Sequence, residues 1–534
     1  MDWISTRVPY RQTGYFSRII TAYLDKADPL SPFYVHPVSD AGVAASLEAR
    51  RSFPMAHREV LVSELEEQYK GADPAPLVNQ NIAALREANT FTIVTAHQPA
   101  IFTGHLYFIY KILHTIRLAE SMARKHPDCR FVPVFYMGSE DADLDELGHV
   151  YLGGEKIVWD TKQKGAVGRM KTKGLDKLLD RIGGELLVQP FGEELMRMLK
   201  AAYLESPDIQ TATFRLLHSL FAEYGLVVLI ADRAAFKKIM IPVFAEDLFR
   251  QTPTQVVGKA IDGLSVHYKV QANPRPINLF YLKDDLRNRI ERSGDGFVVV
   301  DSPLRFTEAE MRGELEKYPE RFSPNVILRG LFQETILPNI AFIGGGGETA
   351  YWLELRGLFA YYKIPFPLLV LRNSFLLVER QWAEKTERAG LEVTDLFKPE
   401  EELVNELVRR DSQQHLSLEQ EILEANRYYE NLKTLARPVD PTLVQHVEAL
   451  QVKALEPVRE LEKKLLKAEK RKFGDQQRQI HALKSSLFPM KGLQERVENF
   501  MPWYARCGRS IIRDLYLHSL TLEQEFVVLT EATL

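Results

Sequence analysis

Five short apolar runs, separated by segments with helical periodicity, constrain the fold of this chain more than any other feature of the sequence. The runs are Phe91–Ala96, Phe131–Tyr136, Gly225–Ile230, Ile340–Ile343 and Phe366–Leu371. Continuous apolar runs of this length are typical of parallel strands in a sheet that is covered on both faces. The segment from Gly104 to about Lys125 repeats its apolar residues every three or four positions, which indicates a helix with one buried face. We therefore predict an α/β fold built on a parallel sheet within residues 90–372.

Two stretches interrupt this alternation of strands and helices. Residues of about 145–220 contain two pairs of glycines and several lysines, and residues of about 255–325 contain only short strand-like runs. We interpret both stretches as insertions into a core that spans residues 1–385. A chain of 534 residues exceeds what one hydrophobic core usually organises, so a second unit over residues 386–534 is expected.

The second region is helical in character. Residues 441–472 are highly charged and place apolar side chains at alternating steps of three and four, a heptad pattern that predicts a partner helix. This seam consists of Val444, Val447, Ala454, Val458, Leu461, Leu465 and Ala468. Phe473–Asp475 interrupts it, and a second seam begins near Ile480. A helical hairpin and an arm that pairs two chains both fit a coiled coil over about residues 441–490, whereas a single solvated helix would leave the seam exposed.

Composition and charge exclude several classes of function. The formal net charge is −4, so the chain lacks the strongly basic character that nucleic-acid binding requires. The two cysteines, Cys129 and Cys507, are too few for a four-cysteine zinc site or a disulfide framework, and they suit a reducing compartment. The N-terminus does not resemble a signal peptide, and no apolar run approaches the ~18 residues that span a bilayer. We expect a cytoplasmic protein without nucleic-acid or membrane partners.

The loops that follow the strands are the candidate binding sites, because parallel α/β sheets bind ligands at the carboxyl ends of their strands. The first loop leads from Phe91–Ala96 into a helix for which Thr103 is the candidate N-cap. The N–H groups and positive dipole end of this helix favour an anion, to which His105 and Lys111 add positive charge. The candidate ligand-binding residues here are His97, Gln98, Thr103, Gly104, His105, Tyr107 and Lys111. An ordinary helix cap with a hydrogen-bonded His97 is the alternative interpretation.

The second loop is acidic, with five carboxylates within residues 140–146. They belong to Glu140, Asp141, Asp143, Asp145 and Glu146. Such a cluster suits an ammonium group, a divalent cation or a general base. Crowded anions repel one another, so we expect some of them to face solvent or cap a helix, and a plain acidic turn is the alternative.

The third loop contains four consecutive glycines, Gly344–Gly347, followed by Glu348 at the start of another predicted helix. The spacing of this run and Ala350 matches a dinucleotide-binding fingerprint, which would make the protein an NAD(P)-dependent oxidoreductase. Glu348 in the first helical turn would repel a pyrophosphate and attract an amine, so a substrate ammonium fits at least as well. After the last strand, Arg372 stands where it can bind a carboxylate through both arms of its guanidinium.

Several blocks, taken in order, resemble the bacillithiol-synthesis cysteine-adding enzyme family, BshC. The blocks are Thr103–Lys111, Pro133–Asp143, Asn278–Leu282, Gln333–Pro338, Ile343–Trp352 and Leu487–Arg496. They are spread over about residues 100–500, which is most of the chain. The resemblance implies a Rossmann-like core similar to class I aminoacyl-tRNA synthetases, with connective insertions and a C-terminal coiled coil that forms a homodimer.

The resemblance also implies a reaction, in which the carboxylate of cysteine joins the amine of glucosaminyl malate as an amide in the last step of bacillithiol synthesis. A bare carboxylate does not form an amide readily, so ATP is the expected activator. We hypothesise that the helix start at Thr103–His105 holds a phosphate or the malyl carboxylate, and that Glu140, Asp143 and Glu348 engage amines. The remaining candidates for substrate binding are Gly345, Gly346, Gly347, Tyr351 and Arg372. No Cys/His set for a metal is present in the sequence.

The chain departs from the family pattern at three places. It has Ala96-His97-Gln98 where the family tends to have Gly-Gln-Gln, His105 in place of Pro, and Ala142 in place of His. The roles of His97 and His105 therefore cannot be transferred from the family. The His-x-Gly-His signature of adenylating enzymes is half present, at Phe102–His105, which leaves the use of ATP open. A coiled-coil interaction protein with a scaffolding α/β part is the rival without enzyme activity.

Overall fold

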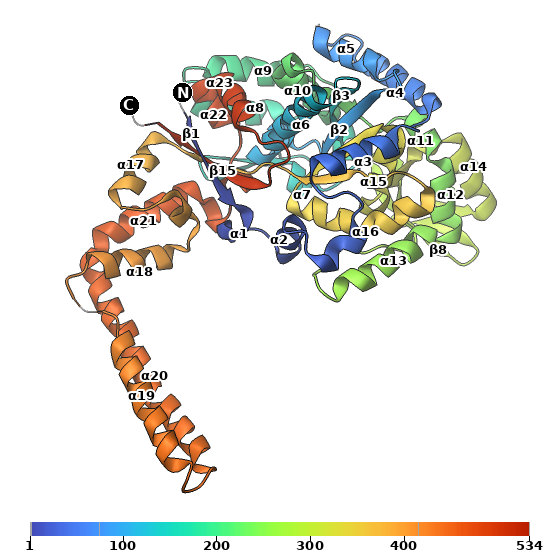
Figure 1. The fold of residues 1–534 in the computed structure, drawn as a ribbon. Helices are drawn as coiled ribbons and strands as arrows, with labels where there is room; N and C mark the ends of the chain where they lie inside the picture. The colour runs from blue at the N-terminus through green and yellow to red at the C-terminus, as the bar shows by residue number, and fades with distance from the viewer. Residues whose placement is uncertain (1–2, 74, 415, 533–534) are drawn as a thin grey trace. The chain divides into compact units, whose positions relative to one another are not determined.

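A five-stranded parallel sheet forms the centre of the computed structural model, which describes residues 3–73, 75–414 and 416–532 (Figure 1). The strand order is β13-β12-β2-β3-β6, and every neighbouring pair is parallel. The strands are β2 (Thr90–His97), β3 (Arg130–Met137), β6 (Val227–Ile230), β12 (Asn339–Gly344) and β13 (Leu368–Leu371). They coincide with the five apolar runs, so the predicted α/β fold with a parallel sheet is confirmed.

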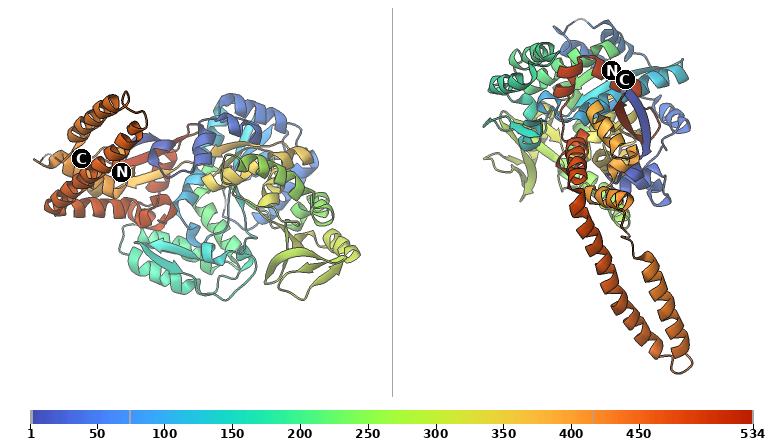
Figure 2. Two further views of the ribbon diagram at one scale, coloured as in Figure 1. Left: turned by 90° about the horizontal axis from the view of Figure 1, so that it is seen from below. Right: turned by 90° about the vertical axis from the view of Figure 1, so that its left-hand side faces the viewer.

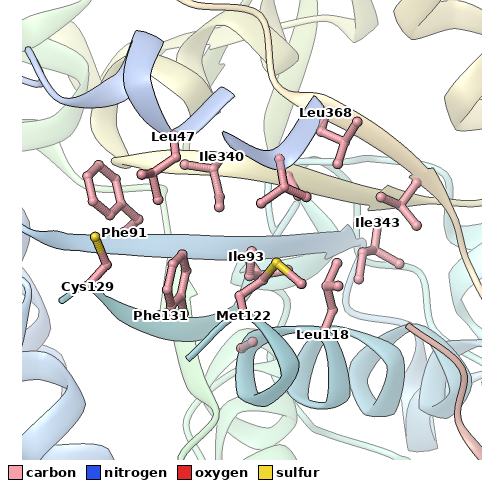
Figure 3. Packing of buried hydrophobic residues seen from close by; sticks show 14 residues of the cluster. Leu47, Phe91, Ile93, Leu118, Met122, Cys129, Phe131, Ile340, Ile343 and Leu368 are labelled. Atoms are coloured by element: carbon pink, nitrogen blue, oxygen red, sulfur yellow. The ribbon is translucent and has the colours of Figure 1, made fainter. Parts of the chain in front are cut away.

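Helices bury both faces of this sheet. On one face, α3 (Asp40–Arg50) and α6 (Leu106–Lys125) pack in a single cluster with alternate strand residues, and Figure 3 shows Leu47, Leu118 and Met122 of these helices around the strands. On the other face lies α16 (Gly346–Tyr362), because its Trp352 stacks on Phe342, a strand residue of the opposite parity, with ring centroids 4.6 Å apart. Burial on both sides is why the strands needed continuous apolar runs.

Two segments with structure of their own separate strands of the central sheet. Between β3 and β6 the chain forms an antiparallel hairpin and three long helices. These are β4 (His149–Leu152), β5 (Glu155–Val158), α8 (Leu175–Leu186), α9 (Gly192–Leu204) and α10 (Ile209–Phe221). Between β6 and β12 it forms a second sheet of order β10-β9-β8-β7-β11, in which all pairs are antiparallel. Its strands are β7 (Leu279–Lys283), β8 (Leu286–Ser293), β9 (Gly296–Val299), β10 (Arg305–Thr307) and β11 (Phe322–Pro324).

The chain forms two compact units. The first consists of the described residues of Met1–Arg11, Tyr15–Leu376 and Gly492–Leu529, and the second is mainly Leu377–Lys491. A third sheet, of order β1-β15-β14, brings the two ends of the chain together through β1 (Trp3–Pro9), β15 (Glu525–Glu531) and β14 (Phe375–Val378). From the sequence we grouped all residues from 386 onward; the structure returns Gly492–Leu529 to the unit that holds the central sheet.

The second unit contains a long helical hairpin. Helices α19 (Glu419–Ala436) and α20 (Leu443–Lys470) lie side by side, as the right-hand view of Figure 2 shows, and Gln451 Nε2 donates to Asn426 Oδ1 at 2.7 Å. Helix α20 therefore has a partner helix within the chain, and the hairpin turn precedes the predicted seam. The seam itself is shifted in part: Val447 is buried as predicted, but Leu455 and Leu466 are buried where Ala454, Leu461 and Ala468 were expected, and these three are exposed. The second seam lies on α21 (Gly474–Leu487), whose Ile480 packs in an apolar cluster with α18 (Glu400–Asp411). Among the described residues, none of the helices combines the length and apolarity that a membrane span needs.

Candidate active site

A cavity of about 880 Å³ lies at the carboxyl ends of the central strands, within the first unit. The loops after β2, β3 and β12 all line it, so the acidic and glycine-rich turns that the sequence singled out share one site. The predicted residues that line the cavity are His97, Gln98, His105, Tyr107, Glu140, Gly345, Gly346, Gly347, Glu348, Tyr351 and Arg372. Thr103, Gly104, Lys111 and Asp143 are not among the lining residues.

The connection from β2 to α6 is a strained loop. Phe102, Thr103 and Gly104 have φ values of 50°, 67° and 60°, and the amide of Asn499 donates hydrogen bonds to the carbonyls of Phe102 and Gly104. Left-handed backbone at two consecutive residues other than glycine persists only where the surrounding structure holds it. Thr103 is buried and is not the N-cap, a position that His105 occupies. The prediction of Thr103 as cap was wrong.

The start of α6 is also less available to an anion than we expected. The first N–H of the helix, that of Leu106, donates to the carbonyl of Glu498 at 2.8 Å. Glu498 belongs to a segment far along the chain, so the sequence around Thr103 carried no sign of this hydrogen bond. His105 is held in the same way, with its Nδ1 3.1 Å from the carbonyl of Val497.

His97 is fixed in one tautomer by two neighbours. Its Nδ1 lies 2.9 Å from the carbonyl of Gln98 and must carry the proton, and its Nε2 then accepts a hydrogen bond from the hydroxyl of Tyr107 at 3.1 Å. Burial, together with the charge of Lys111, lowers the pKa of His97 to about 4. The ring is therefore neutral at physiological pH and offers no positive charge to an anion.

Glu348 lines the cavity as an ionised carboxylate with an internal partner. Its Oε2 accepts hydrogen bonds from Lys111 Nζ at 2.5 Å and from the N–H of Gly345 at 2.8 Å. Burial alone would raise the pKa of Glu348, but the charge and hydrogen bond of Lys111 outweigh it and hold the pKa below its usual value. The Lys111 side chain is 1% exposed and that of Glu348 25%, so the lysine supports the carboxylate and does not reach a ligand itself.

The acidic turn divides into residues that face the cavity and residues that do not. Asp143 is the N-cap of α7 (Leu144–Leu147), where its side chain accepts from the N–H of Glu146 at 3.0 Å, so the expected role of Asp143 on an amine is replaced by helix capping. Asp141 and Glu146 line the cavity instead, and Gln98 Nε2 donates to Asp141 at 3.0 Å. We expected some of these acids to face solvent or to cap a helix, and Asp143 is the one that caps a helix.

Glu140 is the buried member of this turn. It forms an ion pair with Lys237, whose Nζ also lies 3.4 Å from Asp232, and Arg169 binds Asp232 through two hydrogen bonds of 2.6 and 2.7 Å. Burial, opposed by Lys237, raises the pKa of Glu140 above its usual value. Burial also raises the pKa of Glu146, so the sequence cluster contains two carboxylates at the cavity whose affinity for a proton is increased, a property that suits a general base.

Arg372 is occupied by the protein itself. Its Nη1 and Nη2 lie 3.0 and 2.7 Å from the two carboxylate oxygens of Glu495, and its guanidinium lies 4.9 Å from the centre of the Tyr107 ring. The two Nη groups that we expected to bind a ligand carboxylate therefore bind Glu495 instead. Glu495 precedes Arg496, which lines the cavity and which no local feature of the sequence singled out.

The glycine run leaves space at the floor of the cavity. None of Gly344–Gly347 has a positive φ, so no left-handed backbone requires glycine there. A Cβ on Gly344 would approach the ring of Phe342 to 2.9 Å, whereas a Cβ on Gly347 would meet no atom within 4 Å. Tyr351, one turn into α16, accepts a hydrogen bond from Arg329 at 2.6 Å. Arg275, Arg287 and Arg329 also line the cavity and were missed, because they lie outside the loops that follow the strands.

Among the described residues, no group of three or more His, Cys, Asp or Glu side chains is arranged to hold a metal ion. The functional groups at the cavity are carboxylates, guanidinium groups, three tyrosines, side-chain amides and two histidines. Such a set can bind ammonium and carboxylate groups and move a proton.

Comparison with known proteins gives matches over the whole chain. Residues 4–373 match the family model "Bacillithiol biosynthesis BshC, N-terminal Rossmann-like domain", and residues 375–531 match "Bacillithiol biosynthesis BshC, C-terminal coiled-coil domain". A protein of Flavobacterium johnsoniae named "Putative cysteine ligase BshC" is 39% identical, over 98% of this chain and 99% of its own length. A protein of the same name from Cytophaga hutchinsonii is 39% identical, over 96% of each chain. A solved structure titled as a putative arginyl-tRNA synthetase from Campylobacter jejuni covers 85% of this chain and 99% of its own, at 9% identity and a TM-score of 0.21.

Proposed function

The chain belongs to the BshC family of bacillithiol biosynthesis and is a ligase, and we propose that it joins the carboxylate of cysteine to the amine of glucosaminyl malate as an amide. Both compounds carry an amine and at least one carboxylate, so a site for them needs negative and positive groups within one space. The rival interpretations, an NAD(P)-dependent oxidoreductase and a coiled-coil scaffold, find no support in the matched family.

One observation carries the proposal. A single cavity combines the carboxylates of Glu140, Asp141 and Glu348 with arginines that have no carboxylate partner, among them Arg275 and Arg496, in the part of the chain that the structure describes. Its volume of about 880 Å³ lies in the upper part of the range typical of small-molecule sites, so two small substrates fit at once. The carboxylates favour ammonium groups and the arginines favour carboxylates.

The side chains suggest a division of labour in amide formation. The reacting ammonium must lose a proton before its nitrogen can attack the carboxyl carbon of cysteine, and Glu140, whose pKa is raised, is our candidate for the base. Glu348, whose pKa is lowered, stays ionised and holds an ammonium in place. The new C–N bond replaces a C–O bond of the activated carboxylate, and the displaced oxygen departs with the activating group.

Activation of the cysteine carboxylate is the chemistry that ATP supplies when it is bound. The guanidinium of Arg496, which lines the cavity without a carboxylate partner among the described residues, fits a phosphate group. The protein's own contribution is to bring the amine and the carboxyl carbon together, which accounts for a large part of the rate gain in two-substrate reactions.

The test is direct. The purified full chain is incubated with cysteine and glucosaminyl malate, with and without ATP, and mass spectrometry follows both the thiol product and the nucleotide. We expect an N-acylated product only with ATP, together with one nucleotide cleaved for each amide formed. Absence of the amide product when folded protein is given all three reactants contradicts the proposal.

A further inference from the structure

The charged residues that line the cavity are divided by their origin in the chain. The loops after β3 and β12 contribute acidic groups, whereas the lining residues of segment 271–329 include three arginines and no Asp or Glu. We call the lining residues of this segment the arginine wall; its charged members are Arg275, Arg287 and Arg329. The wall has a formal charge of +3, which attracts an anionic group of the ligand.

Hydrogen bonds make the arginine wall one continuous surface. The buried side chain of Asn278 bonds to the backbone N–H and the carbonyl of Arg275 and accepts a hydrogen bond from Asn325 at 3.1 Å, which ties the Arg275 loop to the start of α15 (Val326–Ile336). Arg287 stacks on Phe280 at 4.1 Å and donates to Ser323, the residue that pairs with Phe280 across the sheet. Arg275 and Arg287 are therefore held next to the segment that leads into Arg329.

Within the described part of the chain, no carboxylate lies at ion-pair distance from the three guanidinium groups, although the charge of Asp141 acts on Arg287 and that of Glu348 acts on Arg329. None of them forms an ion pair with a carboxylate among the described residues: Arg287 donates to a hydroxyl, and Arg329 to Gln333 at 3.2 Å and to Tyr351 at 2.6 Å. The side chain of Arg275 is exposed and has no hydrogen-bond partner in the same set. Three guanidinium groups on one cavity wall, none of which has a described carboxylate at ion-pair distance, suit a ligand with more than one negative charge.

We infer that the arginine wall binds the malyl dicarboxylate of the acceptor and so selects glucosaminyl malate over other amino sugars. This assignment rests on the proposed function. Cysteine has a single carboxylate, which is the reacting group. The malyl group has two carboxylates that remain unchanged in the product, and it is attached next to the carbon that bears the amine. With the dicarboxylate on the wall, the amine is directed towards the acids at the strand ends.

The experiment compares Arg275→Gln with Arg305→Gln. Arg305 is an exposed arginine on β10 of the same small sheet and does not line the cavity, which makes it a matched control. For each protein, kcat/KM is measured with glucosaminyl malate and with methyl glucosaminide, which has the amine but no malyl group. We expect Arg275→Gln to lower the preference for glucosaminyl malate by roughly 10- to 100-fold, through a higher KM for this acceptor. The Arg305→Gln variant keeps the wild-type preference.

Further arms separate the possible outcomes. In the double variant Arg275→Gln/Arg287→Gln the preference falls further, while the KM values for ATP and cysteine stay near those of the wild type. A rise in KM confined to ATP would assign the wall to phosphate groups and overturn the inference, as would an unchanged preference in both variants. Calorimetric titration with the two acceptors alone is independent of turnover. Selective binding of glucosaminyl malate without amide formation would refute the proposed function and leave the arginine wall assignment standing.

Discussion

At the scale of single residues, several charged side chains of the site form ion pairs with other side chains of the protein. Lys111 and Arg372 have the chemistry of ligand-binding cations, yet Lys111 is bound to Glu348 and Arg372 to Glu495. Each member of such a buried pair is held by its partner, because a buried charge without a partner is strongly destabilising. What faces the ligand at Glu348 is therefore a carboxylate whose position and ionisation are set by a lysine behind it.

A double-mutant cycle separates the two roles of Glu348. Glu348→Gln and Lys111→Met each leave one unpaired group, and we expect each to lower the free energy of unfolding by roughly 3 kcal/mol. The double variant removes both charges and should be less destabilised than the sum of the single variants. Turnover should stay low in both proteins that contain the Glu348→Gln substitution. Urea unfolding and amide formation are the measurements, and normal turnover of a stable double variant would leave Glu348 with a structural role alone.

The neutral state of His97 predicts a pH dependence of stability. Its pKa in the folded protein is about 4 and its ordinary value is 6.5, so between these values the unfolded chain binds a proton that the folded chain does not. Stability therefore falls as pH decreases from 6.5 towards 4 and is unaffected by this group above 6.5. In His97→Gln, the loss of unfolding free energy between about pH 7.5 and about pH 5 should be about 2 kcal/mol smaller than in the wild type.

Urea titrations at the two pH values measure this difference. His481→Gln serves as the control, because His481 lies on the surface of the second unit, with 68% of its side chain exposed. Equal losses of stability in the wild type and His97→Gln would show that the folded protein accepts the proton on His97.

At the scale of elements, the start of α16 shows why glycines stand next to the cavity. The backbone there is ordinary helix and needs no glycine, but three of the four glycines line the cavity. A side chain at these positions would occupy space that a ligand needs. Gly345–Gly347 are thus explained by the volume above the helix start and Gly344 by its packing against Phe342, and not by a dinucleotide fingerprint.

Replacement of Gly347 by Ala tests this explanation. The new Cβ meets no protein atom within 4 Å and the residue is helical, so stability should rise by up to about 1 kcal/mol. The methyl group projects into the cavity region, and we expect kcat/KM to fall by roughly tenfold or more. Gly313→Ala on α14 (Glu308–Lys317) is the matched control, since its Cβ also meets nothing and it does not line the cavity. Undiminished activity of Gly347→Ala would mean that substrates do not approach this helix start.

At the scale of the whole molecule, the helical hairpin exposes apolar side chains that its two helices do not bury. Tyr428 on α19 is 61% exposed and Val452 on α20 is 66% exposed, and Leu423, Leu435 and Leu461 are also at least half exposed. Large apolar side chains repeated along a pair of charged helices are typical of helices with a further partner. A second copy of the chain is the partner that the family resemblance led us to expect, and dimerisation stays a prediction.

Two variants test dimerisation through the hairpin. Replacement of residues 427–450 by a short turn, and separately Tyr428→Lys/Val452→Lys, should convert a dimer into a monomer in sedimentation velocity experiments. The cavity lies in the other unit, so turnover per chain should change by less than about twofold. A wild-type monomer, or a dimer that survives both changes, would exclude this mode of assembly. Loss of all ligand binding on shortening would instead favour the scaffold interpretation.

The sequence by itself determined the elements of the core and the edge of the sheet at which the site lies. A strand buried on both faces needs a continuous apolar run, so β2 was predicted to within one residue at each end, as Phe91–Ala96 against Thr90–His97. The carboxyl ends of parallel strands share one edge, so Glu140, Glu348 and His97 were expected to meet, and all three line the cavity. These features follow from local periodicity and from topology, both of which are present in the order of residues.

Only the tertiary structure decided which polar groups face a ligand. Arg372 is paired with Glu495, 123 positions later, and Leu106 N–H is taken by Glu498; the arginines of the wall lie outside the strand ends altogether. The partner helix of α20 was likewise α19, for which we had predicted no seam, and the buried residues Leu455 and Leu466 of α20 were not in the predicted seam. A charge is available to a ligand only if no opposite charge of the protein lies beside it. That proximity depends on distances between segments far apart in the chain, which local sequence patterns do not encode.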